Sequence, residues 1–263
     1  MSYLKTCVIV ISVSVIMCIN SCNNQTDQKK VYNGINAKLY KNTPAWNLVH
    51  SMDIRNWELA KEEIRKDSSL SNFIEPLYGN SLLFWAALNS NDKAVQLLLN
   101  SGAEVNKCNF TGNSPIEIAA FYNNCDSHIL QMMLEHQPGN DSLTTYLRNE
   151  ALIAASKNCL KKVKLLINYK ANPSWVSIKS EVFKTITPLA MSVIQEKFDI
   201  VEYYLIELNV DPSTGSFIRN NGDTVRITEQ LHASFSAERT FDQEKTRQQI
   251  NKILDFLAKK GYK

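Results

Sequence analysis

The 263-residue sequence lacks a strong excess of charge of either sign. It contains 29 basic and 26 acidic residues, which leaves a net charge of +3, and its basic residues form no cluster larger than a pair of lysines. Proteins that bind nucleic acid through its phosphates carry a basic patch or stripe. We therefore expect no nucleic-acid binding. Hydrophobic residues make up 44% and charged residues 21%, which is typical of a folded soluble chain.

The sequence also lacks the motifs on which catalysis and cofactor binding usually depend. It contains no G-x-S-x-G, no P-loop and no G-x-G-x-x-G. Its four histidines are scattered, and the zinc pattern H-E-x-x-H is absent. The adjacent Glu62 and Glu63 fall in a charged stretch that is typical of a solvated helix face. We therefore expect neither an enzyme nor a bound metal or cofactor.

Long apolar runs are absent except near the N-terminus. Residues 6–19 form an apolar run after Lys5, which is short for a bilayer span and typical of a signal-peptide core. The run ends in Ile-Asn-Ser-Cys at residues 19–22. This resembles a bacterial lipoprotein signal, in which the cysteine receives the lipid, although Asn20 is more polar than the usual residue. We predict a signal peptide at 1–21 and lipidation of Cys22. The alternative is an ordinary signal peptide or an uncleaved membrane anchor, in either of which Cys22 has no special role.

One short stretch of the sequence occurs twice. "GNSLLFWAALNSN" at residues 79–91 returns as "GNSPIEIAAFYNN" at residues 112–124. Each copy contains Gly-Asn-Ser followed by an apolar helical stretch with an Ala-Ala pair. We interpret the glycine as a tight turn and the serine as the N-cap of the next helix. The alanines are expected to let neighbouring helices pack closely.

Around these copies a longer unit recurs, starting at Ser81, Ser114, Asn149 and Thr187. Each unit contains a helix with an alanine-rich centre, a polar turn and a second apolar helix, and Gly102 ends the second helix of the first unit. The pattern resembles the ankyrin repeat, whose period is about 33 residues and whose first helix opens T-P-L-H-x-A. The resemblance implies an all-α solenoid of helix–turn–helix units with degenerate capping repeats.

The same resemblance implies the domain boundaries. We expect an ankyrin-repeat domain at 44–263, with an N-terminal cap at 44–76, repeats near 79–108, 112–142, 145–175 and 185–215, and a C-terminal cap at 222–263. Helices are expected over 45–66 and near 227–235 and 244–259. The polar residues 22–43 show no helical periodicity and predict a flexible tether.

Few cysteines are available to cross-link this domain. Two of the six lie in the expected signal peptide and Cys22 would carry lipid, which leaves Cys108, Cys125 and Cys159. No Cys or His spacing among them indicates zinc. Two interpretations stand: all three are small packing residues, or Cys125 and Cys159 form a bridge, because both would sit in inter-helix turns of adjacent repeats.

The partner-binding surface is carried over from the ankyrin family by position. In that family the partner usually contacts the finger tips and the exposed side of the first helices, on the concave face. The residues implied here are Tyr78, Asn80, Leu88, Phe110, Asn113, Phe121, Tyr122, Tyr146, Arg148, Lys157, Phe183 and Lys184. Several are aromatic at positions where the fold needs no apolar residue, and aromatic side chains dominate interface hot spots. Local core beneath inserted loops is the alternative for the aromatic members.

The sequence therefore predicts a membrane-tethered, non-catalytic protein-binding scaffold of the bacterial cell envelope. We expect a monomer that is lipid-anchored at the outer membrane and binds an unidentified protein on its concave face. The first alternative is an immunity or antagonist protein that neutralises a toxin in the periplasm. The second is an enzyme with an unrecognised site.

Overall fold

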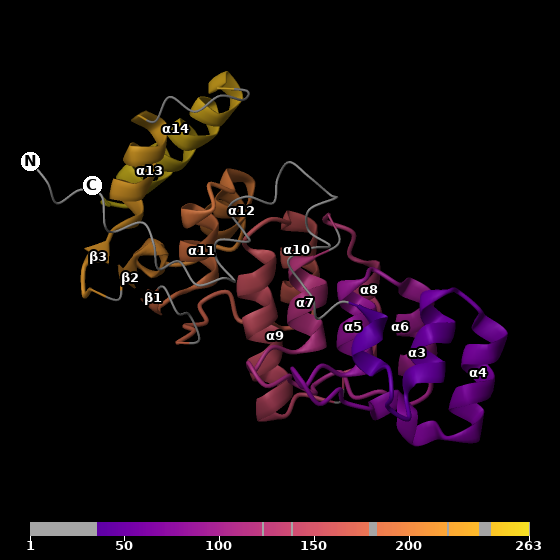
Figure 1. Cartoon of the computed structure of the whole chain (residues 1–263). Helices are drawn as coiled ribbons and strands as arrows, with labels where there is room; N and C mark the ends of the chain where they lie inside the picture. The colour runs from indigo at the N-terminus through magenta and orange to yellow at the C-terminus, as the bar shows by residue number, and fades with distance from the viewer. Residues whose placement is uncertain are drawn as a thin grey trace, which may run out of the picture.

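The computed structural model describes residues 36–122, 124–137, 139–178, 183–219, 221–236 and 243–262. These residues form a row of helix pairs that follows the chain from one end of the molecule to the other (Figure 1). The predicted signal peptide, the lipidation site Cys22 and most of the predicted tether lie outside the described residues. Within them, no helix combines the length and the hydropathy that a membrane crossing requires.

The described helices form six pairs, and most of these helices have ten residues or fewer. They are α3 (Trp46–Asp53) with α4 (Trp57–Lys66), α5 (Leu82–Leu88) with α6 (Asp92–Asn100), α7 (Pro115–Phe121) with α8 (His128–His136), α9 (Ser142–Ala155) with α10 (Leu160–Asn168), α11 (Pro188–Ile194) with α12 (Phe198–Glu202), and α13 (Ile227–Ser236) with α14 (Gln243–Lys259). The 3₁₀ segments η2 (Ala37–Tyr40), η3 (Ser68–Asn72) and η5 (Pro212–Gly215) and the π-helical η4 (Tyr203–Glu207) extend or connect them.

First and second helices form two adjacent rows. In the first row α5 packs against α7, α7 against α9, α9 against α11 and α11 against α13. In the second row α6 packs against α8, α10 against α12 and α12 against α14. Stacking of this kind, in which a unit chiefly contacts its neighbours, is the architecture of a repeat solenoid. It confirms the predicted helical solenoid, and both capping helix pairs lie close to their predicted bounds.

The first helices α5, α7 and α11 begin after a serine or threonine N-cap. The Ser81 hydroxyl accepts the Phe84 N–H at 3.1 Å. Ser114 forms a capping box, because the carboxylate of Glu117 in turn accepts the Ser114 N–H at 2.8 Å. The Thr187 side chain caps α11 in the same way as Ser81 caps α5. Each cap satisfies an N–H group that the helix itself leaves without a partner. The sequence predicted the caps at Ser81 and Ser114.

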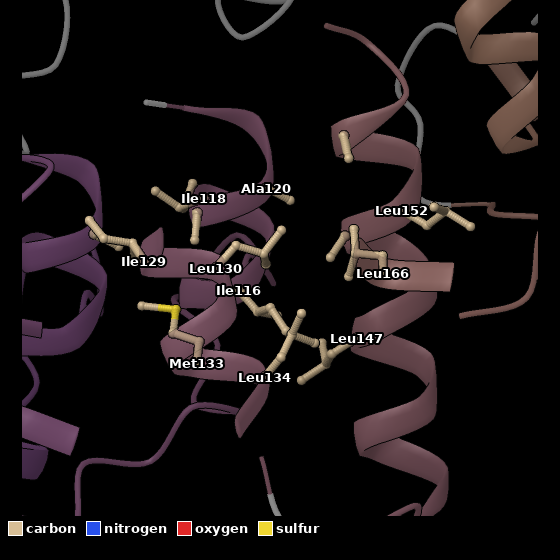
Figure 2. Packing of buried hydrophobic residues seen from close by; sticks show 14 of the residues in the cluster. Ile116, Ile118, Ala120, Ile129, Leu130, Met133, Leu134, Leu147, Leu152 and Leu166 are labelled. Atoms are coloured by element: carbon tan, nitrogen blue, oxygen red, sulfur yellow. The ribbon is translucent and has the colours of Figure 1, made fainter. Parts of the chain in front are cut away.

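Alanine at the centre of the first helices lets neighbouring units approach closely. Ala86 in α5 and Ala119 in α7 are fully buried, and the two helices are in contact. Larger side chains fill the space behind them: Figure 2 shows Ile116, Leu134 and Leu147, from α7, α8 and α9, gathered between their helices. Burying a side chain of this size stabilises the fold by roughly 1.5–3 kcal/mol. One continuous core therefore runs through successive units.

The third unit departs from the predicted repeat. Its first helix, α9, begins at Ser142 instead of near Asn149 and is 14 residues long, against seven for α7. The Asp141 side chain supplies an N-cap at this earlier position. The segment that forms a loop before α5 and α7 is therefore helical here. The prediction that Tyr146 and Arg148 lie at a finger tip is wrong, because both lie inside α9.

A small sheet adds to the helical pattern around the fourth unit. Strand β1 (Phe183–Thr185) pairs with β2 (Phe217–Arg219), which pairs with β3 (Thr224–Val225), and both pairings are antiparallel. The strands come from the segments before and after the fourth unit. The spacing between unit starts is longest there, so the extra residues form a sheet that the sequence analysis did not predict.

The folded part begins before the predicted boundary at residue 44. Tyr40 is fully buried, with its ring edge-on to Trp85 at 6.5 Å between centroids. Its hydroxyl donates to the carbonyls of Asn80 and Ser81 at 3.4 Å each, and burial raises the pKa of this phenol. The predicted tether at 22–43 is therefore wrong for its last residues, because Tyr40 covers the open side of the first full unit.

Residues with a left-handed backbone recur at equivalent turns of the repeat units, although their residue types differ. The turn between the two helices of a unit contains Arg55, Ser90 or Glu196, with φ of 60°, 52° and 55°. The exit from the second helix uses Gly102 at 82° and Lys170 at 69°. Side chains other than glycine resist this region. A search for glycine alone would therefore find only some of these turns.

Candidate protein-binding surface

One buried carboxylate holds the loop before α5 in a fixed shape. Glu75 accepts backbone N–H groups from Leu77 at 2.7 Å and from Tyr78 and Asn80 at 3.0 Å. Gly79 completes the turn with a φ of 75°, which glycine adopts readily. Because the carboxylate satisfies these donors from the inner side, the side chains of Leu77 and Tyr78 are left exposed to solvent.

The loop before α7 rests on this first loop. Phe110 donates its backbone N–H to the Tyr78 carbonyl at 3.0 Å, and Gly112 makes the predicted turn with a φ of 77°. The Phe110 ring lies so close to Gly79 that a Cβ atom there would be 2.5 Å from the ring. Even so, 71% of the Phe110 surface is exposed. Leu77, Tyr78 and Phe110 form what we call the fingertip patch.

A second apolar group lies on the third unit. Tyr146 of α9 packs edge-on against Trp175 at 5.9 Å between centroids, and Trp175 donates its indole N–H to Glu150 at 2.9 Å. Val176 and Ile178 follow in the loop after α10, and Ile178 is 82% exposed. Burial raises the pKa of the Tyr146 phenol, and the Glu150 carboxylate raises it further. Tyr146, Trp175, Val176 and Ile178 form what we call the third-unit patch.

Sequence reasoning missed three members of the third-unit patch, because the positions carried over from the ankyrin family cover only the finger tips and the first helices. The available signal was the spacing of Trp175, Val176 and Ile178, which puts three large apolar side chains where the repeat needs no buried residue. Exposed apolar residues outside both patches also occur, such as Ile54 in the turn between α3 and α4.

Phe121 and Tyr122 lie at the opposite end of α7 from the finger loops. The helix has seven residues, so its ends are about 10 Å apart. The two rings pack edge-on at 4.8 Å, and the Lys157 ammonium lies 5.2 Å from the Phe121 centroid. Both aromatic side chains are half-buried, and Tyr122 packs against the main core. The predicted residues therefore form separate groups, and binding by this group stays a prediction.

The remaining predicted residues of intermediate or high exposure are Asn113, Phe183 and Lys184. Lys184 is exposed and Asn113 is half-exposed. Phe183 packs against a second, smaller core cluster, with its ring 5.2 Å from that of Phe217. Phe183 therefore serves as local core beneath the sheet, which is the alternative raised for the aromatic residues.

Three residues predicted to face the partner are buried instead. Asn80 accepts a hydrogen bond from the Asn109 side chain at 3.0 Å, and Leu88 closes the core at the end of α5. The Arg148 guanidinium donates to two side-chain carbonyls at 3.2 and 3.0 Å and to the Tyr169 carbonyl at 2.6 Å. Burial lowers the pKa of that guanidinium. The prediction that these three side chains are exposed is wrong, because Leu88 belongs to the main core and Asn80 and Arg148 are hydrogen-bonded to neighbouring segments.

Cys125 and Cys159 form a disulfide, with their Cα atoms 5.2 Å apart. It links the turn after α7 to the start of α10, as the second interpretation of the cysteines proposed. Cys108 lies outside this bridge. Among the residues that the structure describes, no group of histidine, cysteine and carboxylate side chains has the arrangement of a metal site.

Comparisons with known proteins agree with this geometry. Residues 83–134, in the first two full units, match the family model for ankyrin repeats in many copies. The structure is similar to the ankyrin repeat domain of Bcl-3, a unique member of the IkappaB protein family, with a TM-score of 0.59 and 17% identity over 82% of this chain and 86% of that chain. It is also similar to the ankyrin repeat protein EF0377, with a TM-score of 0.56 and 23% identity over 80% of this chain and 96% of that chain.

A tyrosine-protein kinase of Hydra vulgaris, HTK16, is 24% identical over 196 residues. The alignment covers 67% of this chain and 24% of that protein, so this chain spans about a quarter of the relative's length. The kinase activity in the relative's name therefore says nothing about the activity of this chain. Together with the two-row stack, the comparisons establish an ankyrin-repeat fold. That fold generally serves as a non-catalytic scaffold for protein binding.

Proposed function

We propose that this chain binds a partner protein, without catalysis, through the fingertip patch and the third-unit patch. The observation that carries the proposal is the exposure of Leu77, Tyr78 and Phe110 on loops whose backbone is fixed by internal hydrogen bonds. Apolar side chains that are already positioned lose little conformational freedom when a partner covers them. Tyrosine and phenylalanine also provide a large contact area for few rotatable bonds.

We further propose that the scaffold is attached by lipid at Cys22 to the bacterial cell envelope, at the outer membrane. The apolar run and the Ile-Asn-Ser-Cys sequence at residues 19–22 support this location. The Cys125–Cys159 disulfide supports an oxidising compartment, because cytosolic thiols are generally kept reduced.

Truncation of the fingertip patch tests the binding surface. The affinity of the chain for the protein that it retains from solubilised cell envelope is measured for wild type, Tyr78→Ala and Phe110→Ala. Each substitution should weaken binding by about 2 kcal/mol, or roughly thirtyfold, because it removes contact area at the centre of the interface. The free energy of unfolding should change little, since Phe110 is 71% and Tyr78 42% exposed in the free protein.

Two controls separate binding from folding. Ile54→Ala removes an apolar side chain that is 55% exposed but lies outside both patches, and it should bind as wild type. Leu98→Ala removes a fully buried side chain and should cost about 2–5 kcal/mol of folding stability. A Tyr78→Ala/Phe110→Ala double variant that remains folded and binds with wild-type affinity would contradict the proposal.

A further inference from the structure

The disulfide joins two units at positions of unequal exposure. Cys125 lies in the turn between α7 and α8 and is exposed, whereas Cys159 directly precedes α10 and is 1% exposed. An incoming thiolate from solvent can therefore approach the Cys125 side of the bridge more readily. Attack there would make Cys159 the leaving sulfur.

The turn that carries Cys125 has an unfavourable backbone conformation. Asn124 and Cys125 are consecutive left-handed residues, with φ of 40° and 68°. The corresponding turns after α5 and α11 contain one such residue each, Ser90 and Glu196. A left-handed conformation is unfavourable for a residue with a side chain, although less so for asparagine. The cross-link to Cys159 therefore holds a turn that its own sequence does not favour.

Cys159 occupies the N-cap position of α10, where a negative charge is stabilised. The helix has nine residues, and its N-cap side chain makes no hydrogen bond to the first turn. At the equivalent position in α6, Asn91 accepts the N–H of Ala94 at 3.1 Å. A Cys159 thiolate could accept in the same way and would lie at the positive end of the helix dipole. Lys162, in the first turn of α10, is buried and donates its ammonium to the carbonyls of Ala119 and Tyr122 at the end of α7.

We propose that the Cys125–Cys159 disulfide is a reversible redox switch that controls the end of α7, with a dithiol as reductant. One thiolate of the dithiol attacks Cys125 Sγ, the Cys125–Cys159 bond breaks, and its electron pair stays on Cys159 Sγ as a thiolate. The second thiolate of the dithiol then attacks the dithiol sulfur that is bonded to Cys125 in the mixed disulfide. Cys125 leaves as a thiolate and takes up a proton. The dithiol leaves as a disulfide, so two electrons pass to the protein.

Reduction would act first on the neighbouring aromatic group. Phe121 is the last residue of α7, and Tyr122 follows it only three residues before Cys125. Asn158, adjacent to Cys159, donates to the Phe121 carbonyl at 2.7 Å. Loss of the bridge leaves this hydrogen bond and the Lys162 contacts with the Ala119 and Tyr122 carbonyls as the remaining links, so the turn after α7 should open while the stacked helices remain. The switch is independent of the proposed partner, and its test requires none.

The direction of exchange is tested with glutathione on the native full chain. After acid quenching and alkylation, peptide mass analysis should find the mixed disulfide on Cys125 at least tenfold more often than on Cys159. Dithiothreitol at millimolar concentration should then reduce the bridge without denaturant. A bridge that resists dithiothreitol in the native state, or glutathione found mainly on Cys159, would overturn the proposal.

Hydrogen exchange tests the structural consequence. Reduction should speed amide exchange at least tenfold at residues 119–122 and 124–128 and leave α5, α6 and α11 unchanged. A Cys125→Ser/Cys159→Ser variant should reproduce the reduced pattern, and Cys108→Ser should behave as wild type. Unchanged exchange would show that the bridge does not control the local structure. Exchange that rises throughout the chain would show that the bridge stabilises the whole fold. Either result refutes a local switch.

Discussion

At position 79 the chain needs both a left-handed backbone and the absence of a side chain. The φ of Gly79 is 75°, and the Phe110 ring occupies the space that a Cβ atom would take. Gly102 also has a left-handed backbone, with a φ of 82°, but no neighbouring atom would lie within 4 Å of a Cβ atom at that position. Alanine at position 102 should therefore show the cost of the backbone conformation alone, and alanine at position 79 should show that cost together with a steric clash.

We expect Gly79→Ala to lower the free energy of unfolding by about 2–3 kcal/mol, and Gly102→Ala by about 1–2 kcal/mol. The difference reflects displacement of the Phe110 ring. In a Phe110→Ala background the two alanine substitutions should cost the same, and denaturant unfolding of the four variants measures this coupling. An unchanged difference in that background would show that the ring is not the cause.

Individual residues could be predicted where their role depends on the next few positions. The Ser81 and Ser114 caps follow from a local pattern of neighbouring residues. The burial of Asn80 and Arg148 does not, because it depends on Asn109 in the next finger loop and on Tyr169 at the end of α10. A position-by-position transfer from a family cannot see such partners.

Among the elements, α10 contributes a buried cation to the end of α7. The Lys162 ammonium donates to the Ala119 carbonyl at 2.9 Å and to the Tyr122 carbonyl. The last carbonyls of a helix lack intrahelical partners, and the helix dipole favours a cation there. Burial opposes this arrangement and lowers the pKa of Lys162 to about 8, although Asp126 raises it slightly.

The free energy of unfolding should therefore rise with pH, because Lys162 loses its proton more readily in the folded chain than in the unfolded one. Between about pH 8 and 10.5 this amine is neutral in the folded chain but protonated in the unfolded one, so the unfolded state binds more protons and higher pH favours folding. Below pH 8 both states are protonated and the full cost of burial is present. From pH 7.5 to 9.5, wild type should gain about 2 kcal/mol more than Lys162→Met in urea unfolding.

The range stops at pH 9.5 because tyrosines begin to ionise in the unfolded chain at about pH 10. Lys161→Met is the matched control, since Lys161 lies beside Lys162 in α10 but is exposed. This variant should keep the wild-type gain. If Lys162→Met shows the same pH dependence as wild type, the buried amine does not titrate as described.

Element boundaries were predictable where the turn chemistry repeats and not where it changes. The helices α5 to α8 follow the two Gly-Asn-Ser copies and match the expected positions. The early start of α9 depends on Asp141, which competes as an N-cap with the expected start near Asn149. Both sites are compatible with the local sequence, and packing of α9 against α7 and α11 favours the longer helix.

At the scale of the whole molecule, anchoring should depend on one cysteine. Cys22→Ala should abolish incorporation of labelled palmitate in a bacterial host, because Cys22 carries the only sulfur at the end of the proposed signal peptide to which the lipid would be added. Cys18→Ala is the control and should keep the label, since this residue lies inside the apolar run. Mass analysis of the wild-type protein should find Cys22 at the N-terminus. Label that persists in Cys22→Ala would contradict lipidation at this site.

The overall architecture was predictable because each unit encodes its own two helices, and stacking follows from their shared apolar faces. Features that join distant segments were not. Tyr40 packs on Trp85, which lies beyond α3 and α4 in the chain, and β1 pairs with β2 on the far side of the fourth unit. Neither contact leaves a local periodic pattern, so both emerge only from the three-dimensional arrangement.

The second and third units are joined more firmly than the others, and this bears on their inheritance. Repeat arrays can change length over evolution by the duplication or loss of whole units. Loss of the third unit alone would remove Cys159 and Lys162 together, which would leave Cys125 without its bridge and the end of α7 without its cation. It would also remove α9, whose extended start replaces a finger loop. Descendants of this chain are therefore expected to gain or lose these two units as a pair.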